Sequence, residues 1–442
     1  MENDKLSFWA RNRVVFKAII IGILTLLLLI PTVMIRQLIV EREGRQEEAA
    51  AEISSKWSGK QILTGPVLSI PYLENYKDEA GNVKAVVKYA HILPEQLNVS
   101  GELFPEKRNR SIFEIVVYKS QLKFSGYFNT ITPGMLNVPK ASFMPEKAFI
   151  TFGISDLRGI EEQITFKWNN SSLNFNPGVE TTDVVQSGIN TRVKINLSDS
   201  LTSRYDFSFD LNLKGSQTLY FVPIGKITEV NINSKWKSPG FDGAFLPDTR
   251  TIDDKGFKAS WKVLNMNRNY PQYWTESTYK VDDSSFGINL LMPMDGYQKA
   301  SRSLKYAILL IALTFMIFFF IEIMNNKLLH PFQYILVGLA LSIFYTLLLS
   351  FSEHMTFNLA YILAAVLTMG LIFLYTRSIL VDKKLSLLIG SVLFILYAFI
   401  FTIIQLEDYA LLMGSIGLFV ALAIIMFYSR KIDWYHTGIK KN

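Results

Sequence analysis

The sequence of 442 residues contains no cysteine, which excludes disulfide bonds, cysteine nucleophiles, thiolate zinc sites and lipid attachment to cysteine. Histidine is also scarce, with four residues scattered at positions 91, 330, 354 and 436. They form no His-x-x-x-His pair and join no carboxylate cluster, so the sequence predicts no metal site and no cofactor.

Long hydrophobic runs are missing from residues 36–303 but dominate both flanks, and 50% of all residues are hydrophobic. The first run, residues 18–35, is long enough to cross a hydrocarbon layer of about 30 Å. Basic residues precede it, and no small-x-small cleavage site follows it. We therefore interpret it as an uncleaved membrane anchor rather than a secretory signal peptide.

Five more apolar runs lie in the C-terminal third of the chain. They are 304–324, 332–350, 358–376, 385–404 and 409–428. Runs of this length with almost no polar face are not typical of buried helices in a soluble protein. The sequence therefore predicts six spans, with a five-helix transmembrane bundle over residues 304–428.

The connections between these runs differ in charge, and this difference predicts their orientation. Residues 351–357 and 405–408 contain no Lys or Arg, whereas the alternate connections and both ends of the chain together carry twelve. Because basic connections mark the cytoplasmic side, residues 1–17 and 429–442 are predicted to be cytoplasmic and residues 36–303 periplasmic. The formal charge of +7 is then a signal of topology, and no nucleic-acid partner is expected.

The inserted segment, 36–303, changes its pattern along its length. Residues 36–57 are rich in Glu, Ala, Arg and Gln and are predicted to form a helical stalk or packing element. Within residues 60–300, apolar and polar residues alternate in many short runs, most strictly over 204–213. Polar turns separate these runs, so we expect an antiparallel, sandwich-like all-β domain. Its length allows one large sandwich or two smaller units.

Several long motifs resemble those of the CreD family, and they extend over nearly the whole chain. They are Glu41-Arg42 with Arg45, Ile53–Trp57, Gln61, Gly65–Leu68 with Pro71-Tyr72, Ser155–Ile160, Pro223–Lys226, Gly243–Asp248, Asn267-Arg268, Pro271-Gln272, His330–Tyr334, Ser352–His354, Phe357–Tyr361, Leu406–Leu412 and Asp433–Tyr435. The resemblance implies a bacterial inner-membrane protein associated with cell-envelope integrity. It also implies membership of a two-component signalling output and an effect on colicin tolerance. It supplies no catalytic residue.

Two catalytic patterns can be tested against the sequence of the inserted segment. A Ser–His–Asp hydrolase would have to use His91, the one histidine there, but the segment has no Gly-x-Ser-x-Gly turn. Ser120 and Lys123 have the spacing of a Ser–Lys pair, yet three residues along a strand place them on opposite faces. We therefore expect a protein that is not an enzyme.

Transport is the alternative function. The middles of the six runs contain no Asp, Glu, Lys, Arg or His, and Glu322 lies near the inner end of its run. Coupled carriers usually place such residues within the bilayer, so ion coupling is disfavoured. A carrier or lipid-handling protein that moves hydrophobic molecules would not need them and stays possible.

One candidate site lies in the two short turns predicted to face outward. Glu353 and His354 occupy the first turn, and Glu407 and Asp408 the second. Together they could form a patch that docks the β-domain or senses pH through His354; alternatively they are turn residues that the topology places in water. The expected partners are the lipid bilayer and periplasmic or envelope proteins or lipids. The predicted function is to support envelope integrity by binding or organising envelope components through the β-domain.

Overall fold

The computed structural model describes residues 13–77, 82–110, 113–129, 132–136, 138–197, 204–290, 296–325, 327, 329–406 and 409–430. The chain divides into two compact units. The first combines Met1–Gln46 with Met294–Asn442, and the second is Glu47–Pro293.

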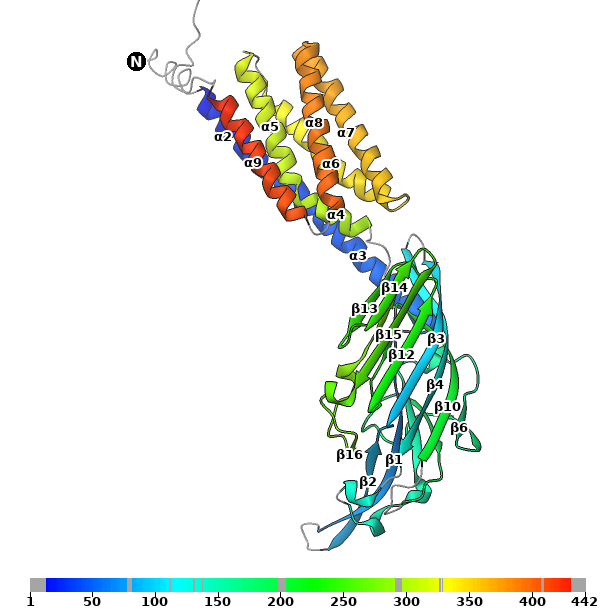
Figure 1. Cartoon of the computed structure of the whole chain (residues 1–442). Coiled ribbons are helices and arrows are strands. Elements are labelled where there is room, and N and C mark those ends of the chain that lie inside the picture. The colour runs from blue at the N-terminus through cyan, green and yellow to red at the C-terminus, as the bar shows by residue number, and fades with distance from the viewer. Residues whose placement is uncertain are drawn as a thin grey trace, which may run out of the picture. The chain divides into compact units, whose positions relative to one another are not determined.

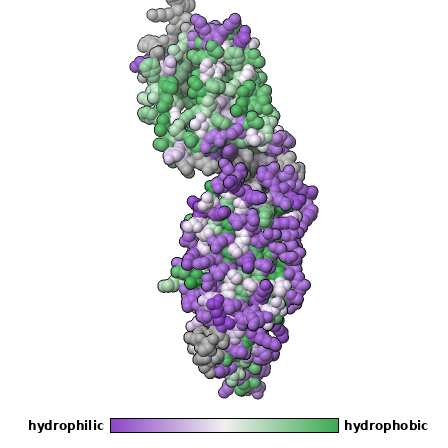
Figure 2. Space-filling model, turned by 45° about the vertical axis from the view of Figure 1, so that its right-hand side comes forward, coloured by the Kyte–Doolittle hydropathy of each residue, from purple (hydrophilic) through white to green (hydrophobic). Residues whose placement is uncertain are grey.

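The first unit is a helical bundle (Figure 1). Its helices are α2 (Arg13–Leu27), α3 (Leu29–Trp57, which continues into the second unit), α4 (Gly296–Lys305), α5 (Ala307–Met324), α6 (Pro331–Ser352), α7 (Phe357–Leu380), α8 (Lys383–Gln405) and α9 (Ala410–Ser429). Within the described residues, six helices are long and apolar enough to span a membrane, α2 and α3 counting as one. Figure 2 shows the hydrophobic surface of this unit, with hydrophilic residues at its ends. The predicted six-span bundle is confirmed.

Local sequence explains where several of these helices begin or bend. His330 and Asp382 cap α6 and α8, because their side chains accept hydrogen bonds from backbone N–H groups of the first turn. The first span breaks at Leu28, between α2 and α3. Pro31 follows three residues later; it lacks an N–H group, and its ring would clash with the Leu27 carbonyl in a continuous helix.

The second unit contains two β-sheets. The nine-stranded sheet has the order β13 (Pro239–Gly243), β17 (Phe286–Leu290), β11 (Thr218–Phe221), β1 (Gln61–Lys77), β5 (Phe149–Ile154), β9 (Gly188–Arg192) and β8 (Asn176–Pro177), with β2 (Val83–Ile92) paired to β1 and β16 (Tyr273–Thr275) paired to β2. The eight-stranded sheet has the order β14 (Thr249–Asp253), β15 (Gly256–Leu264), β12 (Ile227–Ser234), β3 (Gln96–Arg110), β4 (Phe113–Asn129), β10 (Arg204–Ser216), β6 (Thr165–Trp168) and β7 (Ser171–Asn174). Short 3₁₀ turns are Pro133–Leu136, Lys140–Ser142, Pro145–Lys147, Leu157–Gly159, Asn265–Asn267 and Asp282–Ser284.

The all-β class is confirmed, with one refinement of strand direction. Most pairs are antiparallel, but β1 pairs with β11, and β12 with β3, in parallel. Both sheets are therefore mixed. Parallel pairing requires a long crossover between the two strands, which a pattern of apolar alternation does not reveal.

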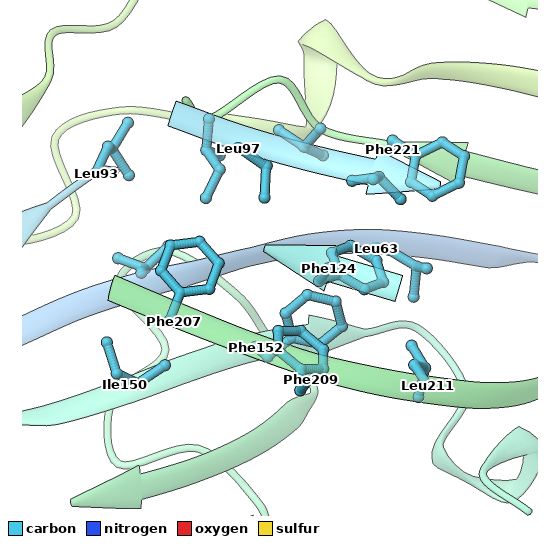
Figure 3. Close-up of a cluster of buried hydrophobic side chains, with 14 of the residues drawn as sticks. Leu63, Leu93, Leu97, Phe124, Ile150, Phe152, Phe207, Phe209, Leu211 and Phe221 are labelled. Carbon is cyan, nitrogen blue, oxygen red and sulfur yellow. The ribbon is translucent and has the colours of Figure 1, made fainter. Parts of the chain in front are cut away.

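The two sheets share one hydrophobic core, so the unit is one large sandwich (Figure 3). Phe207 and Phe209 of β10 point into this core, as the strict alternation of residues 204–213 predicts. The rings of Phe124 and Phe209 stack with centroids 4.8 Å apart, and Phe152 meets both edge-on. Each buried phenylalanine contributes about 1.5–3 kcal/mol, so this aromatic cluster holds the sheets together and leaves the outer faces free for other roles.

Candidate functional site

The outward face of the eight-stranded sheet carries a hollow of about 810 Å³, which we call the trough. It crosses β15, β12, β3, β4 and β10, which follow one another across the sheet in Figure 1. Strand alternation sends the apolar side chains of these strands into the core, so polar side chains are left to line the outer face. The polar residues of the alternating pattern, which face solvent, therefore form the lining of the trough.

Strand register arranges the trough residues in two adjacent rows. One row consists of Ser260, Asn231, Ser100, Lys123 and Asp210, each paired with the next on the neighbouring strand. The other consists of Lys258, Asn233, Glu102, Gln121 and Asn212. Directly opposed residues have Cβ atoms about 4.5–5.5 Å apart. Each row is therefore a continuous line of hydroxyl, amide and charged groups.

Most of these side chains have no partner of their own. Asn212 donates a hydrogen bond from Nδ2 to Glu162 Oε1 at 2.5 Å. For the other nine residues of the two rows, the described part of the chain offers no side-chain hydrogen bond or ion pair. A ligand would therefore find donors and acceptors that need not first break internal bonds.

The chemistry of the trough is polar and nearly balanced in charge. Lys123 and Lys258 supply positive charge, and Glu102, Glu162 and Asp210 supply negative charge. Phe104 follows Glu102 on the same face of β3, and its side chain is 37% exposed. The trough can accordingly bind hydroxyl and amide groups along its length, with one aromatic ring near its edge.

A second polar arrangement surrounds His91 in the nine-stranded sheet. His91 of β2 lies opposite Ser69 of β1. Ser69 Oγ lies 2.9 Å from His91 Nδ1, and His91 Nε2 lies 3.2 Å from Asp183 Oδ2. Burial lowers the pKa of His91, and the Asp183 carboxylate partly opposes that shift. A neutral ring that donates from Nε2 to Asp183 and accepts at Nδ1 from Ser69 satisfies all three groups.

This order of nucleophile, base and acid is that of a hydrolytic triad. However, His91 is fully buried and Ser69 is only 1% exposed, so neither can reach a substrate in this conformation. The hydrogen bonds instead tie Asp183, which lies between β8 and β9, to the sheet. The sequence does not reveal this arrangement, because no local motif such as a Gly-x-Ser-x-Gly turn marks Ser69. Only the pairing of β1 with β2 brings Ser69 to His91.

The Ser120–Lys123 pattern is not a catalytic pair. Ser120 is buried and donates a hydrogen bond to the Leu213 carbonyl at 2.9 Å, whereas Lys123 is exposed in the trough. Their side chains lie on opposite faces of β4, as the spacing predicts.

The predicted outer-turn patch is only partly within the described residues. Glu353 follows α6; its Oε1 accepts a hydrogen bond from Tyr297 OH at 3.2 Å and lies 3.5 Å from Arg42 Nε. His354 is exposed. Glu407 and Asp408 lie outside the described residues, so whether the two turns meet stays a prediction. Glu353 itself connects α3, α4 and α6, which is a structural role within the bundle.

Glu322 is more deeply buried than its position near the end of a span suggests, with only 4% of its side chain exposed. It forms an ion pair with Lys17 of α2. Tyr334 OH donates to Oε2 at 2.9 Å, and the Leu329 N–H donates to Oε1 at 3.1 Å. Lys17 also donates to the Leu329 carbonyl at 2.8 Å. These contacts satisfy both carboxylate oxygens and join α2, α5 and α6.

Two of the recognised motifs serve the architecture of the β-unit. Gln61 is fully buried, and its Nε2 donates to Ser58 Oγ and to the carbonyls of Asp156 and Lys214. Arg158 binds the Asp156 side chain, and this contact lowers the pKa of Asp156 to about 2. The motif thereby fixes the start of β1 to the turn after β5.

Arg268 organises the second of these motifs. Its guanidinium donates to the carbonyls of Ile224, Tyr270 and Pro271 and to Gln272 Oε1. Burial lowers its pKa, and the four acceptors take the place of a carboxylate. The motifs Pro223–Lys226, Asn267-Arg268 and Pro271-Gln272 are therefore three parts of one hydrogen-bonded junction.

Comparison with known proteins identifies the family of this chain. The family described as Inner membrane protein CreD matches residues 13–435. The Inner membrane protein CreD of Escherichia coli (strain K12) is 35% identical over 421 residues, which cover 94% of this chain and 92% of that protein. These matches include both the helical bundle and the β-sandwich, and they support a multi-pass location in the inner membrane. The chain belongs to the CreD family of inner membrane proteins.

Proposed function

We propose that this chain is a non-enzymatic protein that supports cell-envelope integrity by binding an envelope glycan in the trough of its β-sandwich. The observation that carries the proposal is the double row of ten polar side chains across five strands, of which all but Asn212 have no partner among the described residues. In the predicted topology this face lies in the periplasm, where a polymer rich in hydroxyl and amide groups is available to it.

The lining of the trough favours a glycan over other envelope components. A lipid chain would need an apolar lining, whereas the apolar side chains at this place, such as Leu122 and Ile232, are buried in the core. An extended peptide that adds to a sheet needs a free edge, but the trough lies on inner strands. A strongly acidic polymer would need an excess of cations, which the balanced charge does not provide.

Binding to isolated peptidoglycan sacculi tests this proposal. The full chain in detergent is sedimented with sacculi, and the variant Gln121→Ala/Asn231→Ala/Asn233→Ala is compared with Asn129→Ala. Asn129 is an exposed residue of β4 outside the trough. Each lost hydrogen bond weakens binding by about 0.5–1.5 kcal/mol, so the triple variant should bind at least tenfold more weakly and cause envelope sensitivity in cells. Unchanged sedimentation of the triple variant would reject the proposal.

The alternative with a specific observation in its favour is a serine hydrolase, because Ser69, His91 and Asp183 form a hydrogen-bonded chain. It requires Ser69, which is buried in this structure, to become exposed to substrate. Labelling of the full chain by a fluorophosphonate, abolished in Ser69→Ala, would support this alternative. Envelope sensitivity caused by Ser69→Ala, with unfolding unchanged, would do the same. We expect neither result.

The carrier alternative receives less support from the buried charges. Glu322 is the buried acid of the described bundle, and its oxygens are already bound by Lys17, Tyr334 and Leu329. A coupling ion would have to replace these contacts. We therefore assign this cluster to assembly of the bundle rather than to transport.

A further inference from the structure

Helix α4 has two faces of different chemistry. Tyr297, Ala300, Ser303 and Leu304 are buried against the bundle, at the spacing of one helix face. The remaining surface carries three cations and no acidic residue. These cations are Lys299, Arg302 and Lys305.

Contacts place α4 at one end of the bundle. Its first residue, Gly296, lies against Ser352 at the end of α6, and Tyr297 OH donates to Glu353 just beyond it. Lys299 Nζ lies 5.7 Å from the ring centroid of Phe357, the first residue of α7. Because the turn between two membrane-spanning helices lies at the membrane surface, α4 lies at the depth of the lipid headgroups.

Among the residues that the structure describes, the cations of α4 have no acidic partner. Arg302 and Lys305 form no ion pair with any residue in the described ranges, and Lys299 contacts an aromatic ring. In the predicted topology α4 lies on the periplasmic side of the membrane. By the positive-inside rule, Lys and Arg are uncommon beside a span on that side. Three cations at this depth, with no carboxylate against them in the described part of the chain, complement the phosphate groups of anionic lipids.

We infer that α4 is a binding site for anionic phospholipids, with Lys299, Arg302 and Lys305 contacting the headgroup phosphate. The apolar face of α4 is fixed to the bundle, so the cations are held at a constant depth. The site would therefore select lipids by the charge of the headgroup rather than by the acyl chain.

Lipid retention by the full chain tests this inference. The protein is reconstituted in nanodiscs of phosphatidylcholine with a minor share of phosphatidylglycerol, extracted in mild detergent, and its retained lipids are counted by native mass spectrometry. A headgroup contact from one cation is worth about fivefold in affinity. The variant Lys299→Gln/Arg302→Gln/Lys305→Gln should lose at least fivefold of the phosphatidylglycerol enrichment.

Three comparisons keep the test specific. Lys383→Gln/Lys384→Gln removes two cations at the other end of the bundle and should leave the enrichment unchanged. Lys299→Arg/Lys305→Arg keeps the charge and should also retain it, which separates charge from folding. Added inorganic phosphate should not displace the lipid. The inference is overturned if the triple variant keeps the wild-type enrichment or if the Lys383/Lys384 variant loses as much of it. It is equally overturned if the arginine variant loses the enrichment or if free phosphate displaces the lipid.

Discussion

The ion pair between Lys17 and Glu322 allows a quantitative prediction about assembly of the bundle. In Lys17→Met, the Glu322 carboxylate keeps the hydrogen bonds from Tyr334 and Leu329 but loses its cation. The carboxylate is buried, with 4% exposed, and breaking a buried pair from one side costs about 3–5 kcal/mol. This variant should therefore be strongly destabilised.

The opposite single variant should be milder. In Glu322→Gln, Lys17 keeps its bond to the Leu329 carbonyl, and its side chain is 19% exposed, so water can solvate part of the remaining charge. We expect a loss of about 1–2 kcal/mol. The double variant Lys17→Met/Glu322→Gln removes both charges and should be more stable than Lys17→Met alone, with a coupling energy of at least about 2 kcal/mol.

Unfolding of the full chain in bicelles by SDS, followed by far-UV circular dichroism, measures these free energies. Lys17→Arg, which retains the charge, is the matched control and should change stability by less than about 1 kcal/mol. Additive effects of the two single changes, or a loss below about 1 kcal/mol in Lys17→Met, would refute the assignment of this pair to assembly.

Three other changes test packing, titration and the motif junction by thermal unfolding. Gly338→Ala should destabilise the bundle by about 1–3 kcal/mol, because a Cβ there would collide with Leu28 and Phe315. A Cβ at Gly370 would meet open space, so Gly370→Ala should stabilise α7 by up to about 1 kcal/mol. Equal effects of the two substitutions on stability would contradict this prediction. Because burial depresses the pKa of His91, its contribution to stability is complete above the unfolded pKa of about 6.5 and is lost as the pH falls below it. His91→Gln should abolish that pH dependence in the β-unit, and an unchanged profile would rule out His91 as its source. Arg268→Met leaves buried carbonyls without a donor and should lower stability by about 3 kcal/mol. The control Arg250→Met, at an exposed position, should lower it by less than about 0.5 kcal/mol. A similar loss in both variants would show that the Arg268 hydrogen bonds do not stabilise the β-unit.

The sequence predicts much of this fold because lipid and water leave different patterns of hydrophobic residues in it. The apolar runs specify the spans, and the two-residue alternation of 204–213 specifies which side chains enter the core. Small residues such as Gly338 and Ser342 already indicate close helix packing, and both are buried. Strand order and the parallel pairs β1–β11 and β12–β3 depend on contacts between distant residues, so no local pattern contains them.

The candidate sites were harder to predict for the same reason. Asn231, Ser100 and Lys123 are ordinary outward-facing strand residues in the sequence, and only register aligns them. Asp183 is 92 residues from His91, in a segment with no motif. Glu322 was correctly placed near a span end, but its burial depends on Lys17, which comes from the other end of the chain.

The proposed function requires that the trough faces the periplasm, where an envelope glycan can enter it. The chain has no native cysteine, so Asn231→Cys places a single reactive thiol in the trough. Cells with a permeabilised outer membrane and an intact inner membrane are treated with a maleimide that cannot cross the inner membrane. If the trough faces the periplasm, the thiol is labelled in these cells. Labelling that occurs only after the inner membrane is disrupted would contradict it.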